Sequence, residues 1–340
     1  METRYCGIDL HRNFSTVCIV NQAGEIIEEK KLMHRGGDLQ AYFSSQEVLN
    51  CVFEPMDGWG WLSDYLEGCG HEVHLANPYK VQLIAESRTK TDKVDARILA
   101  QLLRLGYLPE SYVASREIRD RRSFLRYRRS LVQQRTRNKN QVHRLLRMEG
   151  IHPPEVTDLF GKKGRSWLED ECSLRPVHER IKEETLSLMD RVDTYAEMID
   201  RELKKEITPE VKRLMTIPGI GVFLANVIIA ETGDIHRFAT PKHFSGYTGL
   251  VCSQRSSGGK ECFGKITKQG NKVLRWAFVE AAQRAHITDS NLRCFRDRIA
   301  MKKGSARGTV ALARKLAEVT WHVWIRGEDF DTNKVKRRFG

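Results

Sequence analysis

The sequence predicts an α/β domain followed by two regions that are mainly helical. Short apolar segments of strand-like composition alternate with helical spacing through the first 112 residues. Strand signals are absent from Ser115 to about Ile207, where apolar residues recur at intervals of three and four. Apolar helices and glycine-rich turns follow. We expect an α/β domain at 1–112, a basic helix with a coiled-coil region at 113–209, a mostly helical domain at 210–330 and a basic tail at 331–340.

The first domain begins with a predicted antiparallel meander, and its later strands alternate with helices. Strands are expected at 5–11, 14–20, 25–32, 49–54 and 72–76. Helices are expected at 39–43, 59–68 and 90–104. This order of elements is that of a ribonuclease-H-like domain, in which the first and fourth strands lie side by side and parallel.

Four acidic residues converge in this arrangement. Asp9 lies within the first strand, Glu54 ends the fourth, and Asp92 and Asp95 share one face of the closing helix. An acid inside an apolar strand is costly unless a cation compensates it, and neighbouring carboxylates raise each other's pKa. The four acids therefore predict a divalent-cation site.

Each acid also has a simpler interpretation by itself. An Asp-x-x-Asp pair at a helix start is commonly a cap with a favourable dipole charge. An acid at a strand end, such as Glu54, is commonly a surface residue.

The charge of the chain indicates a polyanionic partner, of which nucleic acid is the commonest. The chain has 340 residues, 40% of them hydrophobic, and a formal net charge of +13. Twelve Arg or Lys residues and only two acids lie between Arg116 and Arg147. This segment either contacts nucleic acid or forms a solvated charged surface. The nucleic-acid-binding candidates within it are Arg121, Arg122, Arg126 and Arg129.

No apolar run approaches the roughly 18 residues that a membrane span needs, and no secretory segment precedes the first strand. We expect a cytoplasmic protein without a membrane partner. The eight cysteines show no Cys-x-x-Cys or paired Cys/His spacing, which favours reduced structural thiols over a zinc site.

The middle region has the pattern of a long helical hairpin. An arginine-rich helix with apolar residues from Leu125 to Leu146 is interrupted by a loop at 150–154. Apolar residues then recur from Ile181 to Leu203 among many acids. We expect an antiparallel pair with one basic and one more acidic arm.

Two glycine-rich segments mark the last domain. Pro218-Gly219-Ile220-Gly221 lies between two apolar helices, as in a helix-hairpin-helix element that approaches a DNA phosphate, although a tight helix–helix turn explains it as well. Further on, a serine-rich block precedes a helix that Asn271 should cap.

The serine-rich block combines flexible backbone with positive charge. Ser256 and Ser257 stand before Gly258 and Gly259, whose backbone N–H groups can cradle an anion. From chemistry alone a phosphate-contacting loop is favoured over a nucleophilic serine, because no His or Asp lies within a few residues. The basic candidates around the block are Arg255, Lys260, Lys265, Lys268 and Arg275.

These segments together resemble the insertion sequence 110 type of transposases, which are related to pilin-gene DNA invertases and described as bridge-RNA-guided recombinases. The resemblance runs over nearly the whole chain. Its most specific blocks are Thr91-Asp92 through Asp95-Ala96, and Ser256 through Lys260 followed by Lys268-x-Gly270-Asn271. Gly7-Ile8-Asp9, the strand ending at Glu54, Ile217 through Gly221 and Arg275 also match.

The resemblance implies a RuvC-like domain in which Asp9, Glu54, Asp92 and Asp95 bind Mg²⁺, with Mn²⁺ as an alternative. It implies a coiled-coil insertion and a C-terminal transposase domain whose serine corresponds to Ser257. That serine would attack a DNA phosphate and form a phosphoserine intermediate. The site would be completed across protomers of a homodimer or tetramer, and a noncoding RNA would pair with donor and target DNA in a prokaryotic cell.

Two positions depart from the family pattern or compete with it. The residues after Glu54 differ from the common pattern and offer Asp57 as a rival acid. Ser256 is a rival to Ser257, which we prefer because the position next to Gly258 is the one that the family pattern keeps. A DNA invertase, a metal-dependent nuclease or junction resolvase that uses water, and a non-catalytic nucleic-acid scaffold are the alternative functions.

Overall fold

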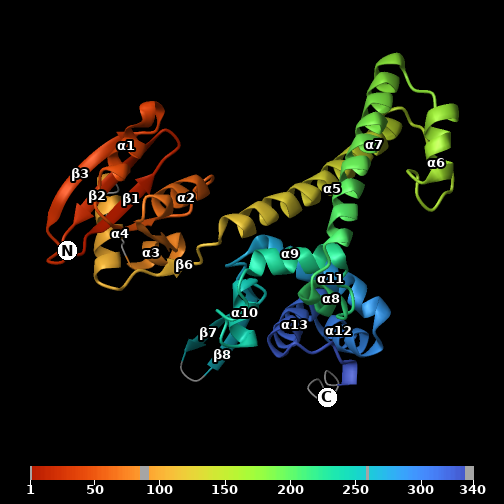
Figure 1. Ribbon diagram of the computed structural model, residues 1–340. Helices are drawn as coiled ribbons and strands as arrows, with labels where there is room; N and C mark the ends of the chain where they lie inside the picture. Colours follow the sequence, from red (N-terminus) through yellow and green to blue (C-terminus); the bar gives the residue numbers. More distant parts are fainter. Residues whose placement is uncertain (1, 85–91, 258–259, 334–340) are drawn as a thin grey trace. The chain divides into compact units, whose positions relative to one another are not determined.

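The computed structural model describes residues 2–84, 92–257 and 260–333 of the chain. The chain forms two compact units, Met1–Arg119 and Asp120–Gly340, and each is described by itself (Figure 1). Several predicted features lie outside the described residues. They are Thr91 of the closing-helix block, Gly258 and Gly259 of the serine block, and residues 334–340 of the expected tail.

The first unit is built on a mixed sheet with the strand order β3-β2-β1-β4-β5-β6. Its strands are β1 (Tyr5–Leu10), β2 (Phe14–Val20), β3 (Ile26–Met33), β4 (Asn50–Phe53), β5 (Glu72–Ala76) and β6 (Glu110–Ser111). β1 pairs antiparallel with β2 and parallel with β4, where Ile8 is opposite Phe53. The predicted meander and the predicted parallel neighbours are both confirmed, whereas the two-residue edge strand β6 was not predicted.

Helices cover both faces of this sheet. They are η1 (Arg35–Gly37), α1 (Asp38–Ser44), α2 (Gly60–Gly68), α3 (Pro78–Ile84) and α4 (Asp92–Arg104). Ile8 and Phe53 belong to the core that packs against α1 and α2. The alternate side chains, among them Val52 of β4, pack against α3 and α4. Because side chains alternate along a strand, Asp9 shares the α4 face of β1 with Gly7.

Helix α4 approaches β1 closely at Gly7. A Cβ atom built on Gly7 would lie 2.0 Å from the backbone oxygen of Ala96 and 2.7 Å from the nitrogen of Ala100. These obstacles are helix backbone, which cannot rotate away as a side chain can. The absence of a side chain at Gly7 therefore lets α4 pack closely over the strand that carries Asp9.

Replacing Gly7 by Ala should destabilise the first unit by about 1–3 kcal/mol or more, because α4 must shift to relieve the overlap. Gly68→Ala is the matched control, since no heavy atom lies within 4 Å of a Cβ there. Gly68 ends a helix, where Ala is the better helix former, so this control should stay within about 1 kcal/mol of the wild type. Urea unfolding of the two variants measures the difference. Equal stabilities would show that α4 does not depend on this close approach.

The second unit contains most of the helices. In chain order its elements are α5 (Arg116–Met148, which begins in the first unit), α6 (Lys162–Ser166), η2 (Trp167–Glu171), α7 (Pro176–Lys205), α8 (Pro209–Met215), α9 (Val222–Thr232), α10 (Pro241–Tyr247), β7 (Cys252–Ser257), β8 (Lys260–Ile266), α11 (Lys272–Thr288), α12 (Ser290–Lys303) and α13 (Ser305–Arg326). β7 and β8 form an antiparallel hairpin. None of the described helices combines the length and the apolar character that crossing a membrane requires.

Helices α5 and α7 form the predicted antiparallel pair of a basic and a more acidic arm. Arg128 pairs with Asp200 at 2.7 Å, and Arg135 pairs with Asp193 at 3.0 Å. The partners advance by seven residues on α5 while they recede by seven on α7, so the two helices run antiparallel. Towards the end of α5, Leu146 belongs to a separate small core that the α5–α7 connection completes.

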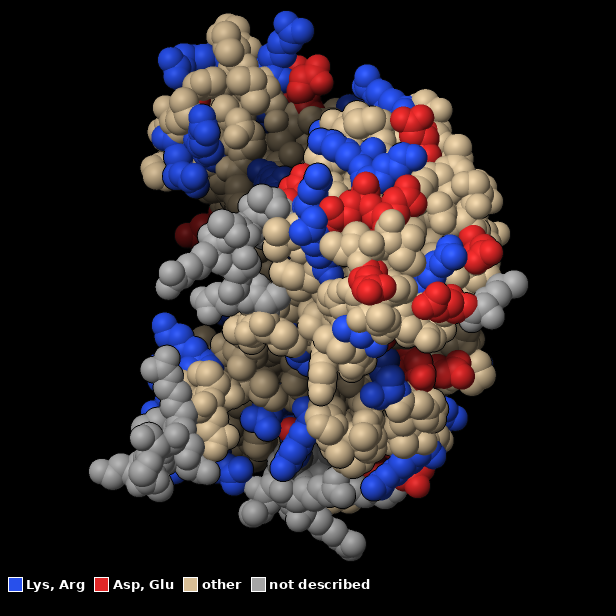
Figure 2. Space-filling view, turned by 90° about the vertical axis from the view of Figure 1, so that its left-hand side faces the viewer, with Lys and Arg blue, Asp and Glu red and all other residues tan. Residues whose placement is uncertain are grey.

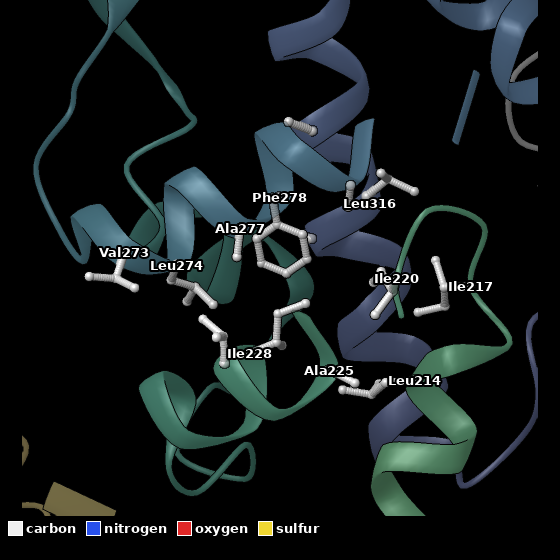
Figure 3. Close-up of a cluster of buried hydrophobic side chains, with 14 of the residues drawn as sticks. Leu214, Ile217, Ile220, Ala225, Ile228, Val273, Leu274, Ala277, Phe278 and Leu316 are labelled. Atoms are coloured by element: carbon white, nitrogen blue, oxygen red, sulfur yellow. The ribbon is translucent and has the colours of Figure 1, made fainter. Parts of the chain in front are cut away.

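The remaining helices pack around one apolar core, with Phe278 of α11 among its central residues (Figure 3). Side chains from α8, α9, α11 and α13 meet there. The predicted turn at Pro218–Gly221 joins α8 to α9. Gly219 has a φ of +84°, and a Cβ on it would lie 2.2 Å from the backbone oxygen of Ala281. This turn is therefore packed against α11.

Candidate functional site

The end of β1 places an acid and a histidine next to each other. Asp9 is the last but one residue of β1, and its side chain is 19% exposed. His11 follows in the turn to β2, where its backbone N–H donates to the oxygen of Phe14. The Nε2 atom of His11 lies 3.0 Å from Oδ2 of Asp9. The turn therefore directs the imidazole back toward the strand.

Helix α4 brings its first turn to the same place. Asp92 is the first residue of α4, and its Oδ2 atom lies 3.5 Å from Nε2 of His11. Asp95 lies one turn further along the helix, close enough for its charge to act on Asp9. The prediction that both acids belong to the start of one helix is confirmed, and Asp92 is the member whose carboxylate reaches His11.

Glu54 follows directly after β4. The last pair of the β1–β4 ladder joins Ile8 to Phe53, so Asp9 and Glu54 are the next residues of two parallel neighbours. Glu54 thus stands at the same end of the sheet as Asp9. The rival Asp57 is exposed in the following turn.

The electrostatics of this end of the sheet are unfavourable for an isolated carboxylate. Burial raises the pKa of Asp9, and the negative charges of Asp92 and Asp95 raise it further. The neighbouring His11 acts in the opposite direction and lowers the pKa of Asp9. The net effect is a raised pKa, which means that the ionised carboxylate lacks compensation in the fold. A bound cation would supply this compensation.

The donor set fits a divalent cation. Asp9, His11 and Asp92 each offer one ligand atom, and these atoms all lie within 4.8 Å of one another. Carboxylate oxygens suit Mg²⁺ and Mn²⁺, and an imidazole nitrogen is a ligand that transition-metal ions accept more readily than Mg²⁺ does. Glu54 and Asp95 lie outside this group of three. Sequence interpretation did not include His11, although an Asp-x-His pattern at the end of a buried strand was a usable signal.

Ser257 lies in the second unit, at the tip of a hairpin. It is the last residue of β7 and pairs with Lys260, the first residue of β8. Ser256 pairs with Glu261. Lys265, in β8, is exposed. The described part of the serine block is therefore strand up to the glycine pair, rather than an irregular loop.

The segment from Lys268 to Asn271 is held by specific backbone contacts. Lys268 has a positive φ of 55°, and its carbonyl accepts a hydrogen bond of 3.1 Å from Arg275. Asn271 caps α11, as predicted, because its Oδ1 accepts from the N–H groups of Val273 and Leu274. Arg275 therefore supports the backbone of this segment, while the Lys268 side chain is exposed.

The arginines of α5 that were predicted to contact nucleic acid make contacts inside the second unit. Arg126 forms two hydrogen bonds, of 2.7 and 2.8 Å, to the buried carboxylate of Glu231. Arg122 donates to the carbonyl of Ala230 at 2.7 Å. The other two contacts are Arg121 with the side chain of Asn226 and Arg129 over the ring of Trp276.

Charge counts along the sequence therefore overstate the free basic surface of α5. On the face shown in Figure 2, some basic side chains lie beside acidic ones, while others gather with few acidic neighbours. Glu231 was not singled out from the sequence because it lies in an apolar helix, about 105 residues from its partner Arg126. A lone acid in an otherwise apolar helix was the only signal for it.

Comparison with known proteins gives a consistent result over both units. Residues 6–151 match a family model described as a transposase of the DEDD, IS110 type. Residues 211–299 match the transposase family IS116/IS110/IS902. The transposase for insertion sequence element IS1328 of Yersinia enterocolitica is 27% identical over 95% of this chain and 97% of its own length.

Two further relatives cover nearly the whole chain. The transposase for insertion sequence element IS1111A of Coxiella burnetii is 26% identical over 97% of this chain and 92% of its own length. The pilin gene-inverting protein of Moraxella lacunata is 25% identical over 97% of this chain and 98% of its own length.

Proposed function

The chain belongs to the IS110 family of transposases, enzymes that cleave and join DNA, and from this premise we propose how its residues carry out the reaction. In our proposal Asp9, Glu54, Asp92 and Asp95 hold a divalent cation, and Ser257 is the nucleophile. The observation that carries the proposal is the meeting of Asp9 and Asp92 at one end of the sheet, where burial and the charge of Asp92 raise the pKa of Asp9.

The fold of the first unit supports this assignment. The order β3-β2-β1-β4-β5 with β1 and β4 parallel is the arrangement expected of a RuvC-like, ribonuclease-H-like domain. Two parallel strands end side by side and supply Asp9 and Glu54, while α4 supplies Asp92 and Asp95. We also infer the division into a RuvC-like domain at 1–112, a coiled-coil region at 113–209 and a transposase domain at 210–330.

A bound Mg²⁺, or Mn²⁺, would polarise the scissile phosphate and stabilise the departing oxygen. The protein supplies the positions of the ligands. Asp9 is fixed by the β1 ladder, and Asp92 and Asp95 are fixed by the close packing of α4 on Gly7. Because these positions are set by backbone packing, the carboxylates are arranged before DNA arrives.

Ser257 would hold the cleaved DNA strand in a covalent bond to the protein. Its hydroxyl oxygen forms a bond to the scissile phosphorus as the bond to one deoxyribose oxygen breaks, so the phosphodiester count is unchanged. The serine loses its proton to solvent, and the departing sugar oxygen takes one up. Attack of a second DNA hydroxyl on the phosphoserine reverses these steps and releases the enzyme.

The positive side chains of the hairpin region would hold the DNA backbone. Lys265 and Lys268 are exposed, and Arg275 supports the segment that carries Lys268. Arg122 and Arg126 already have partners inside the unit, so we assign most phosphate contacts to the hairpin and to exposed residues of α5 such as Arg137.

The family resemblance extends the proposal to partners. We infer that a noncoding RNA of the element guides donor and target DNA, and that a homodimer or tetramer completes the site across protomers. Because pilin gene-inverting proteins are among the relatives, inversion of a DNA segment is the second candidate function. A nuclease or resolvase that uses water in place of Ser257 is the remaining alternative.

The test is the fate of the DNA strand in Ser257→Ala protein. Wild-type protein, incubated with the junction DNA and noncoding RNA of its own element, should give a protein–DNA adduct on a denaturing gel. Ser257→Ala should give no adduct and should lose recombination by at least about 10²-fold. Ser256→Ala is the control and should retain both. Normal recombination by Ser257→Ala, or strand cleavage without any adduct in the wild type, would show that water is the nucleophile.

A further inference from the structure

We propose that His11 is a direct ligand of the divalent cation and that it makes this site favour Mn²⁺ over Mg²⁺. The inference rests on the proposed function, in which the acids at the end of β1 and the start of α4 hold a cation. It adds a nitrogen ligand to a set that was otherwise all oxygen.

The imidazole of His11 lies between the two carboxylates. The same atom, Nε2, faces both carboxylates, at 3.0 Å from Oδ2 of Asp9 and 3.5 Å from Oδ2 of Asp92. Neighbouring ligands of an octahedral ion with bonds of about 2.1 Å are separated by about 3.0 Å. The spacing of Nε2 from each of the two carboxylate oxygens is therefore close to that of adjacent corners around one ion, and all three atoms lie within 4.8 Å of one another.

The turn after β1 holds the ring in this orientation. The backbone N–H of His11 donates to the oxygen of Phe14 at 3.0 Å, which closes the β1–β2 turn. The rings of His11 and Phe14 lie 4.6 Å apart between centroids. Lys31 in turn lies 3.6 Å from the centroid of Phe14. The imidazole is thus set by a backbone bond and by ring packing, and its side chain is 35% exposed.

The choice of metal follows from the chemistry of the ligands. Mg²⁺ prefers oxygen ligands and keeps its waters. Mn²⁺ also suits carboxylates, but as a transition-metal ion it accepts an imidazole nitrogen more readily than Mg²⁺ does. Exchanging an oxygen ligand or a water for Nε2 of His11 therefore stabilises bound Mn²⁺ more than bound Mg²⁺. The acids alone would make a site without this preference.

The competing explanation is that His11 only shields the acids from one another. The two roles make opposite predictions for cation binding. A shielding histidine occupies the place of the ion, so its removal should tighten binding. A ligating histidine contributes a bond, so its removal should weaken binding.

The experiment titrates Mn²⁺ into the full chain and follows it by electron paramagnetic resonance. Wild-type protein should show a coupling between bound Mn²⁺ and an imidazole ¹⁴N nucleus. His11→Ala should lose this coupling, and its affinity for Mn²⁺ should fall at least about tenfold, with a smaller fall for Mg²⁺ measured by competition. His34→Ala is the matched control and should change neither quantity, because His34 bonds to Ser15 and to the carbonyl of Arg12.

A variant of Asp9 separates failure of this inference from failure of the proposed function. If Asp9→Asn abolishes Mn²⁺ binding while His11→Ala leaves affinity unchanged or tightens it, the cation site stands and the role of His11 is refuted. If wild-type protein binds no Mn²⁺ in a manner that depends on Asp9, both are refuted.

Discussion

Asp9→Asn protein is expected to cleave DNA strands about 10²- to 10³-fold more slowly than wild type, which is the loss typical of removing one preorganised electrostatic group. Asn keeps the size of the side chain and removes its charge, so the ion loses one anionic ligand. The measurement is the single-turnover rate of strand cleavage on the junction DNA of the element, at saturating Mg²⁺. Under the same conditions Asp57→Asn is the control, because Asp57 is an exposed acid in the turn after Glu54.

Asp9→Asn protein should be no less stable than the wild type. Slow cleavage without a loss of stability is what identifies Asp9 as a residue of the site. The raised pKa of Asp9 means that the folded protein binds a proton there more tightly than the unfolded chain does. At neutral pH the ionised Asp9 therefore destabilises the fold when no cation is bound, and a neutral Asn relieves this. Thermal unfolding in the presence of a chelator should give a Tm for Asp9→Asn equal to or above that of the wild type. If Asp9→Asn cleaved DNA slowly and also had a strongly lowered Tm, misfolding would explain its loss of rate. An equal loss of rate in Asp57→Asn would contradict the assignment of the cation site to Asp9.

Glu231→Ala should lower the free energy of unfolding by about 2–4 kcal/mol. The Glu231 side chain is 2% exposed, and it accepts two hydrogen bonds from Arg126 and one of 2.7 Å from Asn271. Its removal leaves the amide of Asn271, the cap of α11, without this acceptor. Arg126 is half-exposed, so water recovers part of its loss, and for this reason we expect less than the full effect of breaking a buried pair.

The measurement is urea unfolding of Glu231→Ala beside Glu197→Ala. Glu197 and Arg201 form a pair 3.9 Å apart whose side chains are both more than 60% exposed, so this control should change stability by less than about 1 kcal/mol. Glu231→Gln keeps the shape of the side chain and one acceptor oxygen. Its free energy of unfolding should therefore lie between those of Glu231→Ala and Glu197→Ala. Equal stabilities of Glu231→Ala and Glu197→Ala would show that the Arg126–Glu231–Asn271 network contributes nothing measurable.

The sheet of the first unit could be predicted because its strands carry the pattern themselves. Apolar and β-branched residues in β1 and β2, separated by a short turn, specify the antiparallel pair locally. The parallel partner β4 follows from the helix between them and from its apolar character. β6 has only two residues and therefore no pattern to detect.

The candidate site could be predicted only in part, because its geometry depends on contacts between distant segments. Asp9 stood out as an acid in an apolar strand, and Asp92 as the start of a strongly amphipathic helix. The role of His11 depends on the turn that Phe14 closes. The role of Arg126 depends on a carboxylate in another helix. Counting charges shows how many arginines a segment has, but it does not show which of them are already paired.

The most direct test of the cation site is a crystal structure of the full chain grown with MnCl₂ and measured at the manganese absorption edge. The account predicts one strong anomalous difference peak between the carboxylates of Asp9 and Asp92, and its absence from Asp9→Asn crystals grown in the same way. An empty site at this end of the sheet in the wild type, or a peak that persists unchanged in Asp9→Asn, would contradict it.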